Sequence, residues 1–109
     1  MALSLEELHV EDGDEVAVEH IPAALTAASL VYDDGATQRF EPGGGTTYVE
    51  HGRPTRGEWY LDDDGCFWSF WPPSYRARYE LRWIVKDGRI AGLSFVEVGQ
   101  RSRFDGRYQ

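Results

Sequence analysis

The sequence predicts an all-β fold, an antiparallel up-and-down meander that closes, or nearly closes, into a small barrel of about eight strands. Five Asp-Gly dipeptides, which begin at residues 12, 34, 64, 87 and 105, recur at the spacing of strand pairs. Glycine accepts the positive φ that tight hairpin turns require, so each dipeptide predicts a turn. All four tryptophans lie between residues 57 and 95, where aromatic residues are interleaved with polar ones. Closure is expected because an open sheet leaves its edge strands unpaired.

At most one or two short helical turns are expected, and they fall near the N-terminus. Residues 4–8 fit a short helix in which Ser4 is the N-cap and Glu7 completes a capping box. The alternative for this segment is an edge strand over residues 5–11.

The next segments predict a strand, a helical turn and a hairpin. Residues 15–20 alternate apolar and polar side chains, which is typical of a half-buried strand. Residues 22–28 begin with proline and are rich in alanine, which favours one helical turn. Residues 29–33 and 36–41 then form a hairpin around Asp34-Gly35.

This hairpin is predicted to pair Val31 with Gln38. The following strand covers residues 46–51, which are β-branched and aromatic. The tail, residues 100–109, is expected to form a closing strand or a last short hairpin at Asp105-Gly106.

The hairpin at Asp87-Gly88 sets the predicted register of the central strands. A two-residue loop pairs Trp83 with Gly92 and Leu81 with Ser94, since antiparallel partners keep a constant sum of residue numbers. The residues predicted to face inward on these two strands are Tyr79, Leu81, Trp83, Val85, Ile90, Ser94 and Val96.

The preceding hairpin turns at Asp62–Gly65. With a loop of two or four residues, Trp59 lies on the inner face together with Trp68 and Phe70. The outer face of the central strands then carries an aromatic and aliphatic set, which consists of Tyr60, Phe67, Trp71, Ile84, Leu93 and Phe95.

Composition indicates one acidic domain that spans residues 1–109. Its net charge of −8 argues against nucleic-acid binding, because a phosphate backbone would be repelled. No run of residues approaches the roughly 20 apolar positions of a membrane span. Cys66 is the single cysteine, so an internal disulfide is excluded. Since the first ten residues are acidic and not signal-like, a cytoplasmic protein is expected.

Gly57-Glu58-Trp59-Tyr60 resembles the Gly-x-Trp signature of lipocalins and related calycin barrels. The aromatic meander around it is similar to the small ligand-binding barrels of that group. The resemblance implies an apolar small molecule held inside the barrel.

A meander also predicts which residues share an end of the barrel. Glu50, His51, Tyr75 and Arg76 are expected at one end, the candidate mouth, and Cys66 at the other. Glu50 and His51 are the candidate acid and base of an enzyme, because histidine titrates near neutral pH. Exposed polar residues are also normal where a strand enters a loop, so the sequence leaves enzyme and binder both open.

Metal and cofactor sites are not predicted. His9, His20 and His51 lack the close spacing of a zinc or iron site. The glycines of residues 42–45 do not form a phosphate loop, since no strand-to-helix transition with a lysine follows.

Two functions follow from these patterns. The first is a barrel that binds a small apolar or aromatic molecule, either as a binder alone or with an accessory catalytic role. Its ligand-binding residues would be Trp59, Trp68, Phe70, Tyr79, Trp83 and Ser94 inside, with Tyr75 and Arg76 at the mouth. The second is a non-catalytic interaction module or homodimer that uses Tyr60, Phe67, Trp71 and Phe95 on the outer face.

Overall fold

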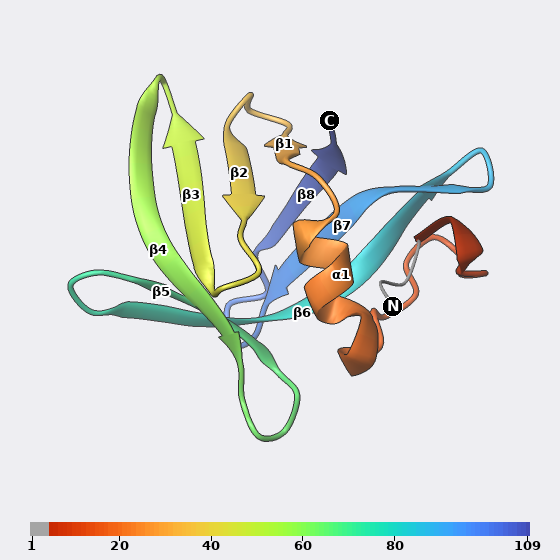
Figure 1. The fold of residues 1–109 in the computed structure, drawn as a ribbon, viewed down its shortest axis with the longest axis horizontal. Helices are drawn as coiled ribbons and strands as arrows, with labels where there is room; N and C mark the ends of the chain where they lie inside the picture. The colour runs from red at the N-terminus through yellow and green to blue at the C-terminus, as the bar shows by residue number, and fades with distance from the viewer. Residues whose placement is uncertain (1–4) are drawn as a thin grey trace.

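The computed structural model describes residues 5–109 and shows a closed barrel of eight antiparallel strands (Figure 1). The strands follow one another around the barrel in sequence order, and β1 closes it by pairing with β8. The predicted all-β meander is therefore confirmed. The strands are β1 (Leu30–Tyr32), β2 (Thr37–Phe40), β3 (Gly45–Glu50), β4 (Arg53–Leu61), β5 (Phe67–Trp71), β6 (Tyr75–Lys86), β7 (Arg89–Glu97) and β8 (Arg103–Tyr108).

The helical content lies near the N-terminus, as expected. A helix, α1 (Ile21–Thr26), has Pro22 in its first turn, and it follows 3₁₀ turns at Leu5–Glu7 and Val18–His20. The predicted cap, Ser4, lies outside the described residues. No helix among residues 5–109 is long and apolar enough to cross a lipid bilayer.

The strand predicted for residues 15–20 is wrong. Only Glu15 forms a bridge, to Arg82 on β6. The backbone around it continues the sheet where β5 has ended, because β5 pairs with β6 only as far as Tyr79. Gly13 N donates to Trp83 O (2.9 Å), and Val16 N donates to Leu81 O (2.9 Å). The chain then turns across the end of the barrel and cannot extend further as a strand.

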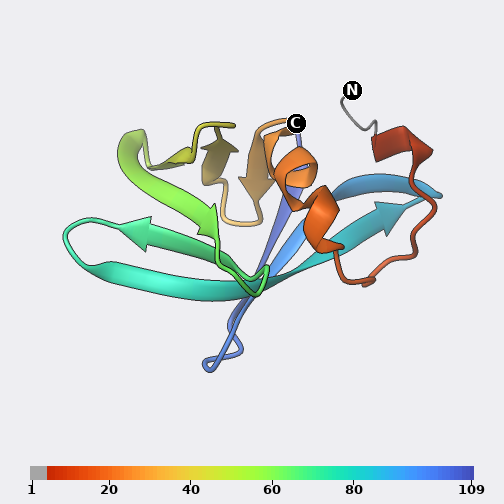
Figure 2. The same cartoon turned by 60° about the horizontal axis from the view of Figure 1, so that its bottom comes forward.

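One end of the barrel is closed by α1. Leu25 is fully buried and Ile21 is 5 % exposed, and the hydroxyl of Tyr108 on β8 donates to the carbonyl of Ala24. Figure 2 shows α1 and the N-terminal segment on the same side of the molecule, away from the β5–β6 turn. The closed end is therefore built from the helix and the apolar residues of the strands beneath it.

The β6–β7 hairpin has the predicted turn but not the predicted faces. Asp87 (φ 53°) and Gly88 (φ 77°) form the two-residue loop, and Lys86 pairs with Arg89. The register then shifts, because Val85 pairs with Ile90 whereas Ile84 pairs with Gly92. Ala91 is thus an extra residue in β7, a bulge that reverses the parity of every later side chain.

The bulge moves Ser94 and Phe95 to the faces opposite to those predicted. Phe95 packs inside the barrel against Phe40, with ring centroids 5.9 Å apart. Ser94 faces outward, and its hydroxyl donates to Asp105 on β8 (2.6 Å). Val96, beyond them, pairs with Glu80 and also lies outside.

The β4–β5 loop has three residues, 63–65, so the predicted loop of two or four residues is wrong. Asp62 N donates to Cys66 O (3.0 Å), and Gly65 has a φ of 82°. This is the pattern of a turn that ends with glycine in the left-handed region. As a result Trp59 pairs with Ser69, whereas a loop of two or four residues would have placed it opposite Trp68.

The odd loop exchanges the two faces of β5. Phe67, Ser69 and Trp71 point into the barrel, while Trp68 and Phe70 point outward with Tyr60. The β1–β2 loop has the same form: Tyr32 N donates to Ala36 O (2.8 Å), and Leu30, not Val31, pairs with Gln38.

The last Asp-Gly dipeptide forms no turn. Asp105 and Gly106 lie within β8, the closing strand that was one of the two expectations for the tail. Gly106 is buried against Tyr32 and Leu30 of β1. On the other neighbouring strand, β7, a Cβ at Gly92 would lie 2.0 Å from the Gly106 carbonyl oxygen. The two glycines therefore let β7 and β8 approach closely.

Candidate ligand-binding cavity

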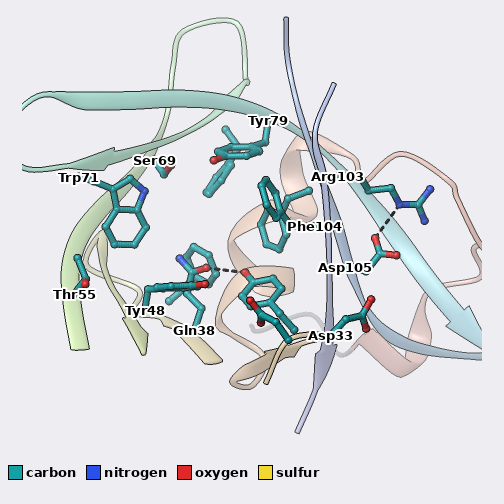
Figure 3. Close-up of a pocket in the computed structure, with 15 residues that line it drawn as sticks. Asp33, Gln38, Tyr48, Thr55, Ser69, Trp71, Tyr79, Arg103, Phe104 and Asp105 are labelled. Atoms are coloured by element: carbon teal, nitrogen blue, oxygen red, sulfur yellow. Dashed lines mark hydrogen bonds and ion pairs between the residues drawn. The ribbon is translucent and has the colours of Figure 1, made fainter. Parts of the chain in front are cut away.

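A cavity of about 520 Å³ opens at the end of the barrel opposite α1 (Figure 3). The turns β1–β2, β3–β4, β5–β6 and β7–β8 surround this end, as the meander predicted for the mouth. The volume lies in the range of small-molecule sites. The lining residues are Tyr32, Asp33, Asp34, Gln38, Phe40, Tyr48, Thr55, Phe67, Ser69, Trp71, Tyr79, Phe95, Arg103, Phe104 and Asp105.

Three phenylalanine rings form the floor. The ring centroids of Phe40, Phe67 and Phe95 lie 5.9–6.0 Å from one another. They come from β2, β5 and β7, so the layer crosses the barrel. Below it the interior is solid, because Trp59 and Trp83 are buried there and do not line the cavity. The open part and the filled part of the barrel interior thus meet at one aromatic layer.

The walls are mostly aromatic as well. Tyr48 lies between Tyr32 and Trp71, with centroid distances of 6.2 Å and 6.3 Å. Figure 3 shows Trp71 and Tyr48 on one side of the cavity, with Phe104 across from them. Phe104 packs edge-on against Tyr79 at 6.4 Å. A ligand in this space would meet ring faces and edges on most sides.

Polar groups on the β1–β3 side of the cavity are satisfied by one another. The Tyr32 hydroxyl donates to Gln38 Oε1 (2.6 Å), and Gln38 Nε2 donates to the Thr46 hydroxyl (3.0 Å). Burial raises the pKa of Tyr32 above its ordinary value, and the charge of Asp34 adds to this effect. These hydrogen bonds fix the orientation of the Gln38 amide.

Ser69 differs from these groups. Its side chain is on the cavity wall in a residue that is 4 % exposed, and its Oγ has no hydrogen-bond partner among the described residues. The Tyr79 phenol lies nearby, and burial raises its pKa to about 12. A buried hydroxyl without a partner costs stability, so it is a natural contact for a ligand polar group.

The rim carries acidic side chains. Asp33 pairs with Arg107 (3.0 Å), and Asp34 accepts a hydrogen bond from the backbone of Ala36 (3.0 Å). Arg103 is held by Asp105 (2.9 Å). Figure 3 shows this second pair on the side of β8 away from Phe104.

Of the residues predicted to bind a ligand, Tyr79 alone lines the cavity. Trp59 and Trp83 face inward but lie below the phenylalanine floor. The inward orientation predicted for Trp68, Phe70 and Ser94 is wrong, because of the three-residue loop and the bulge.

The two residues predicted at the mouth lie beside the cavity. Tyr75 is 51 % exposed, and its hydroxyl donates to Glu97 (3.1 Å). Arg76 faces outward, where its guanidinium lies 4.8 Å from the Phe70 ring centroid and donates to the Tyr60 hydroxyl (2.8 Å).

The residues predicted for an outer interface are largely inside. The outward orientation of Phe67, Trp71 and Phe95 is wrong, and all three line the cavity. Tyr60 is outside, where it stacks on Trp68 with centroids 6.3 Å apart. The homodimer itself stays a prediction.

The proposed acid and base do not line the cavity. Glu50 and His51 are exposed at the β3–β4 turn, where His51 adopts a φ of 52°. Cys66 lies in the β4–β5 turn, at the other end of β4. Within residues 5–109 no group of three metal-ligating side chains comes together.

Several cavity residues were missed by the sequence reading, among them Tyr32, Tyr48 and Phe104. The first two depend on the pairing of β1, β2 and β3, for which a signal existed: Asp-Asp-Gly marks a three-residue loop at both 33–35 and 63–65. No comparable signal marks Phe104 on β8, because the turn between β7 and β8 contains no Asp-Gly dipeptide.

Comparison with known proteins finds no protein family, no curated protein and no solved structure that matches the chain. The resemblance of Gly57–Tyr60 to the calycin signature stays a prediction. In this fold Gly57 has a local role, since the Trp71 ring packs directly against its backbone.

Proposed function

We propose that this protein binds a small, largely apolar molecule with an aromatic or other flat body inside its barrel. The observation that carries the proposal is the cavity of about 520 Å³ above the phenylalanine floor. A barrel of this size has room either for its own side chains or for one small ligand. Here the interior is filled below the phenylalanine floor and open above it.

The chemistry of the lining supports an apolar ligand with one or two hydrogen-bonding groups. Eight of the lining residues are aromatic, and aromatic walls bind flat apolar surfaces through burial and edge or face contacts. Ser69 Oγ offers one unpaired hydroxyl inside this lining. Few, well-placed polar groups in an apolar pocket are typical of small-molecule sites.

A titration read at the individual tryptophans tests this proposal. A panel of aromatic and lipid-like compounds is added to ¹⁵N-labelled protein, and the four indole N–H signals are followed. The Trp71 signal should shift with saturation, because Trp71 lines the cavity. The Trp68 signal should not, since its Nε1 donates to Asp62 on the outer face (2.8 Å).

Two tryptophan variants form a matched pair for the same test. Trp71→Ala should weaken binding by about tenfold or more, because a buried aromatic contact is lost. Trp68→Ala should leave the affinity unchanged. Binding that is equally sensitive to both variants, or no saturable binding across the panel, would overturn the proposal.

A further inference from the structure

We infer that the ligand is an organic cation, a molecule whose flat apolar body reaches the phenylalanine floor and whose ammonium group is held at the mouth. This inference rests on the proposed function and names the ligand class. Its basis is the combination of aromatic rings and carboxylates at one end of the cavity.

The rings near the mouth are suited to a positive charge. Tyr32, Tyr48 and Trp71 line one continuous part of the wall, with neighbouring centroids 6.2–6.3 Å apart. The faces of tyrosine and tryptophan attract cations through their quadrupole, and several such rings together recognise quaternary ammonium groups. The deeper phenylalanine layer offers no charge and suits an apolar body.

The carboxylate of Asp34 stands beside these rings. Burial raises the pKa of Tyr32 and that of Tyr48. The charge of Asp34 contributes to both rises, and at Tyr48 it adds to the larger contribution of Glu50 from the β3–β4 turn. The negative charge of Asp34 therefore acts on both tyrosines. Asp34 forms no ion pair within the described part of the chain, whereas its neighbour Asp33 is paired with Arg107. The Asp34 carboxylate at the mouth is thus left uncompensated.

Among the described residues, the cavity lining offers no unengaged positive group for an anionic ligand. Arg103 is the basic residue of the lining, and its guanidinium is engaged by Asp105 (2.9 Å) and by Ser94 Oγ (3.3 Å) on the outer face. The net charge of −8 also favours the approach of cations over anions.

Ser69 gives an independent sign that the cavity is a binding site. Its hydroxyl is buried, lines the wall and has no partner among residues 5–109. The acidic rim alone would be an ordinary solvated surface. Together with an apolar hollow and an unpaired internal hydroxyl, it becomes the charged end of a ligand pocket.

Three probes that share a naphthylmethyl body test the charge preference by calorimetry, and the first two also match in shape. They are (2-naphthylmethyl)trimethylammonium, its neutral carbon isostere 2-neopentylnaphthalene, and the anion 2-naphthylacetate. The buffer contains about 150 mM salt, which screens long-range attraction to the acidic surface. The cation should bind about tenfold more tightly than the isostere, which corresponds to cation–π contact with two or more rings.

Two aspartate variants locate the preference. Asp34→Asn should lower the affinity for the cation about threefold or more and leave the isostere unaffected, because one carboxylate charge near the site is removed. The control is Asp64→Asn, which removes the same charge from the corresponding position of the loop at the other end of the barrel.

The outcomes separate the two proposals. Equal or tighter binding of the isostere or of the anion overturns the cation inference while the binding function stands. An equal effect of Asp34→Asn and Asp64→Asn also overturns it, because the preference would then reflect overall charge. If none of the three probes binds, the proposed function fails and this inference fails with it.

Discussion

The indole of Trp71 lies directly against the backbone of Gly57. A Cβ at position 57 would be 2.5 Å from Trp71 Cε3 and 2.8 Å from the carbonyl oxygen of Phe70. Both atoms are closer than real Cβ contacts allow, so only glycine at this place in β4 lets Trp71 lie on the cavity wall.

Gly57→Ala should therefore displace Trp71 and destabilise the fold. Alanine normally favours a strand over glycine by up to about 1 kcal/mol, but the clash should outweigh this gain and give a net loss of about 1–3 kcal/mol. Denaturant unfolding measures the loss. The control is Gly43→Ala, because a Cβ at Gly43 meets nothing within 4 Å. Equal stability of the two variants would contradict the packing described for Trp71.

Gly92→Ala should damage the closure of the barrel more severely. The added Cβ would lie 2.0 Å from the Gly106 carbonyl and 2.8 Å from the Arg107 Cα, both of which are backbone atoms of β8. Because backbone cannot rotate out of the way, we expect a loss of about 4 kcal/mol or more, or no soluble folded protein. Circular dichroism and thermal unfolding measure it. A variant that is as stable as wild type would show that the β7–β8 pairing is looser than described.

Two buried serines should respond to alanine substitution in opposite ways. Ser69→Ala removes a hydroxyl that has no partner, so the stability of the ligand-free protein should stay the same or rise by up to about 1 kcal/mol. Ser94→Ala removes the donor to Asp105 (2.6 Å) and should cost about 1–2 kcal/mol. Urea unfolding of both variants gives the comparison. A substantial loss in Ser69→Ala would mean that its hydroxyl already has a partner in solution.

Alkaline pH should destabilise the barrel. Burial raises the pKa of the Tyr79 phenol from 10.0 to about 12, so the folded state holds this proton more tightly than the unfolded chain. The associated stability is complete below about pH 10 and is lost as the pH rises towards 12. The slope from one tyrosine is at most about 1.4 kcal/mol per pH unit and is reduced by solvent, since Tyr79 is only partly buried.

Urea unfolding between pH 8 and pH 11 checks this dependence. Tyr79→Phe should show a shallower decline above pH 10 than wild type does. Part of the decline should remain, because burial also raises the pKa of Tyr32 and that of Tyr108. An identical decline in wild type and variant would contradict the burial described for Tyr79.

The barrel was predictable from sequence because turn dipeptides and aromatic strands act locally. Asp87-Gly88 formed the expected two-residue loop, and the polar and aromatic segments between the turns became strands. The end of the barrel that carries the mouth was also predictable, since a meander places alternate turns together. These features need only local backbone preferences and strand order.

The side-chain faces were not predictable from the dipeptides alone. A loop of three residues at Gly65 and one extra residue at Ala91 each reverse which side chains point inward. The bulge has no signal in its own residues. It arises where β7 must bring Gly92 against Gly106 and so depends on the closure of the whole barrel.

The N-terminal segment, Asp12 to Val16, has a protective consequence for the protein in solution. Beyond Tyr79, β6 has no partner strand on its β5 side, and this segment occupies the backbone groups of Leu81 and Trp83 there. Without it, that free edge would be able to recruit strands from other molecules. Chains that lose these residues, through proteolysis for example, should therefore aggregate before they lose the barrel.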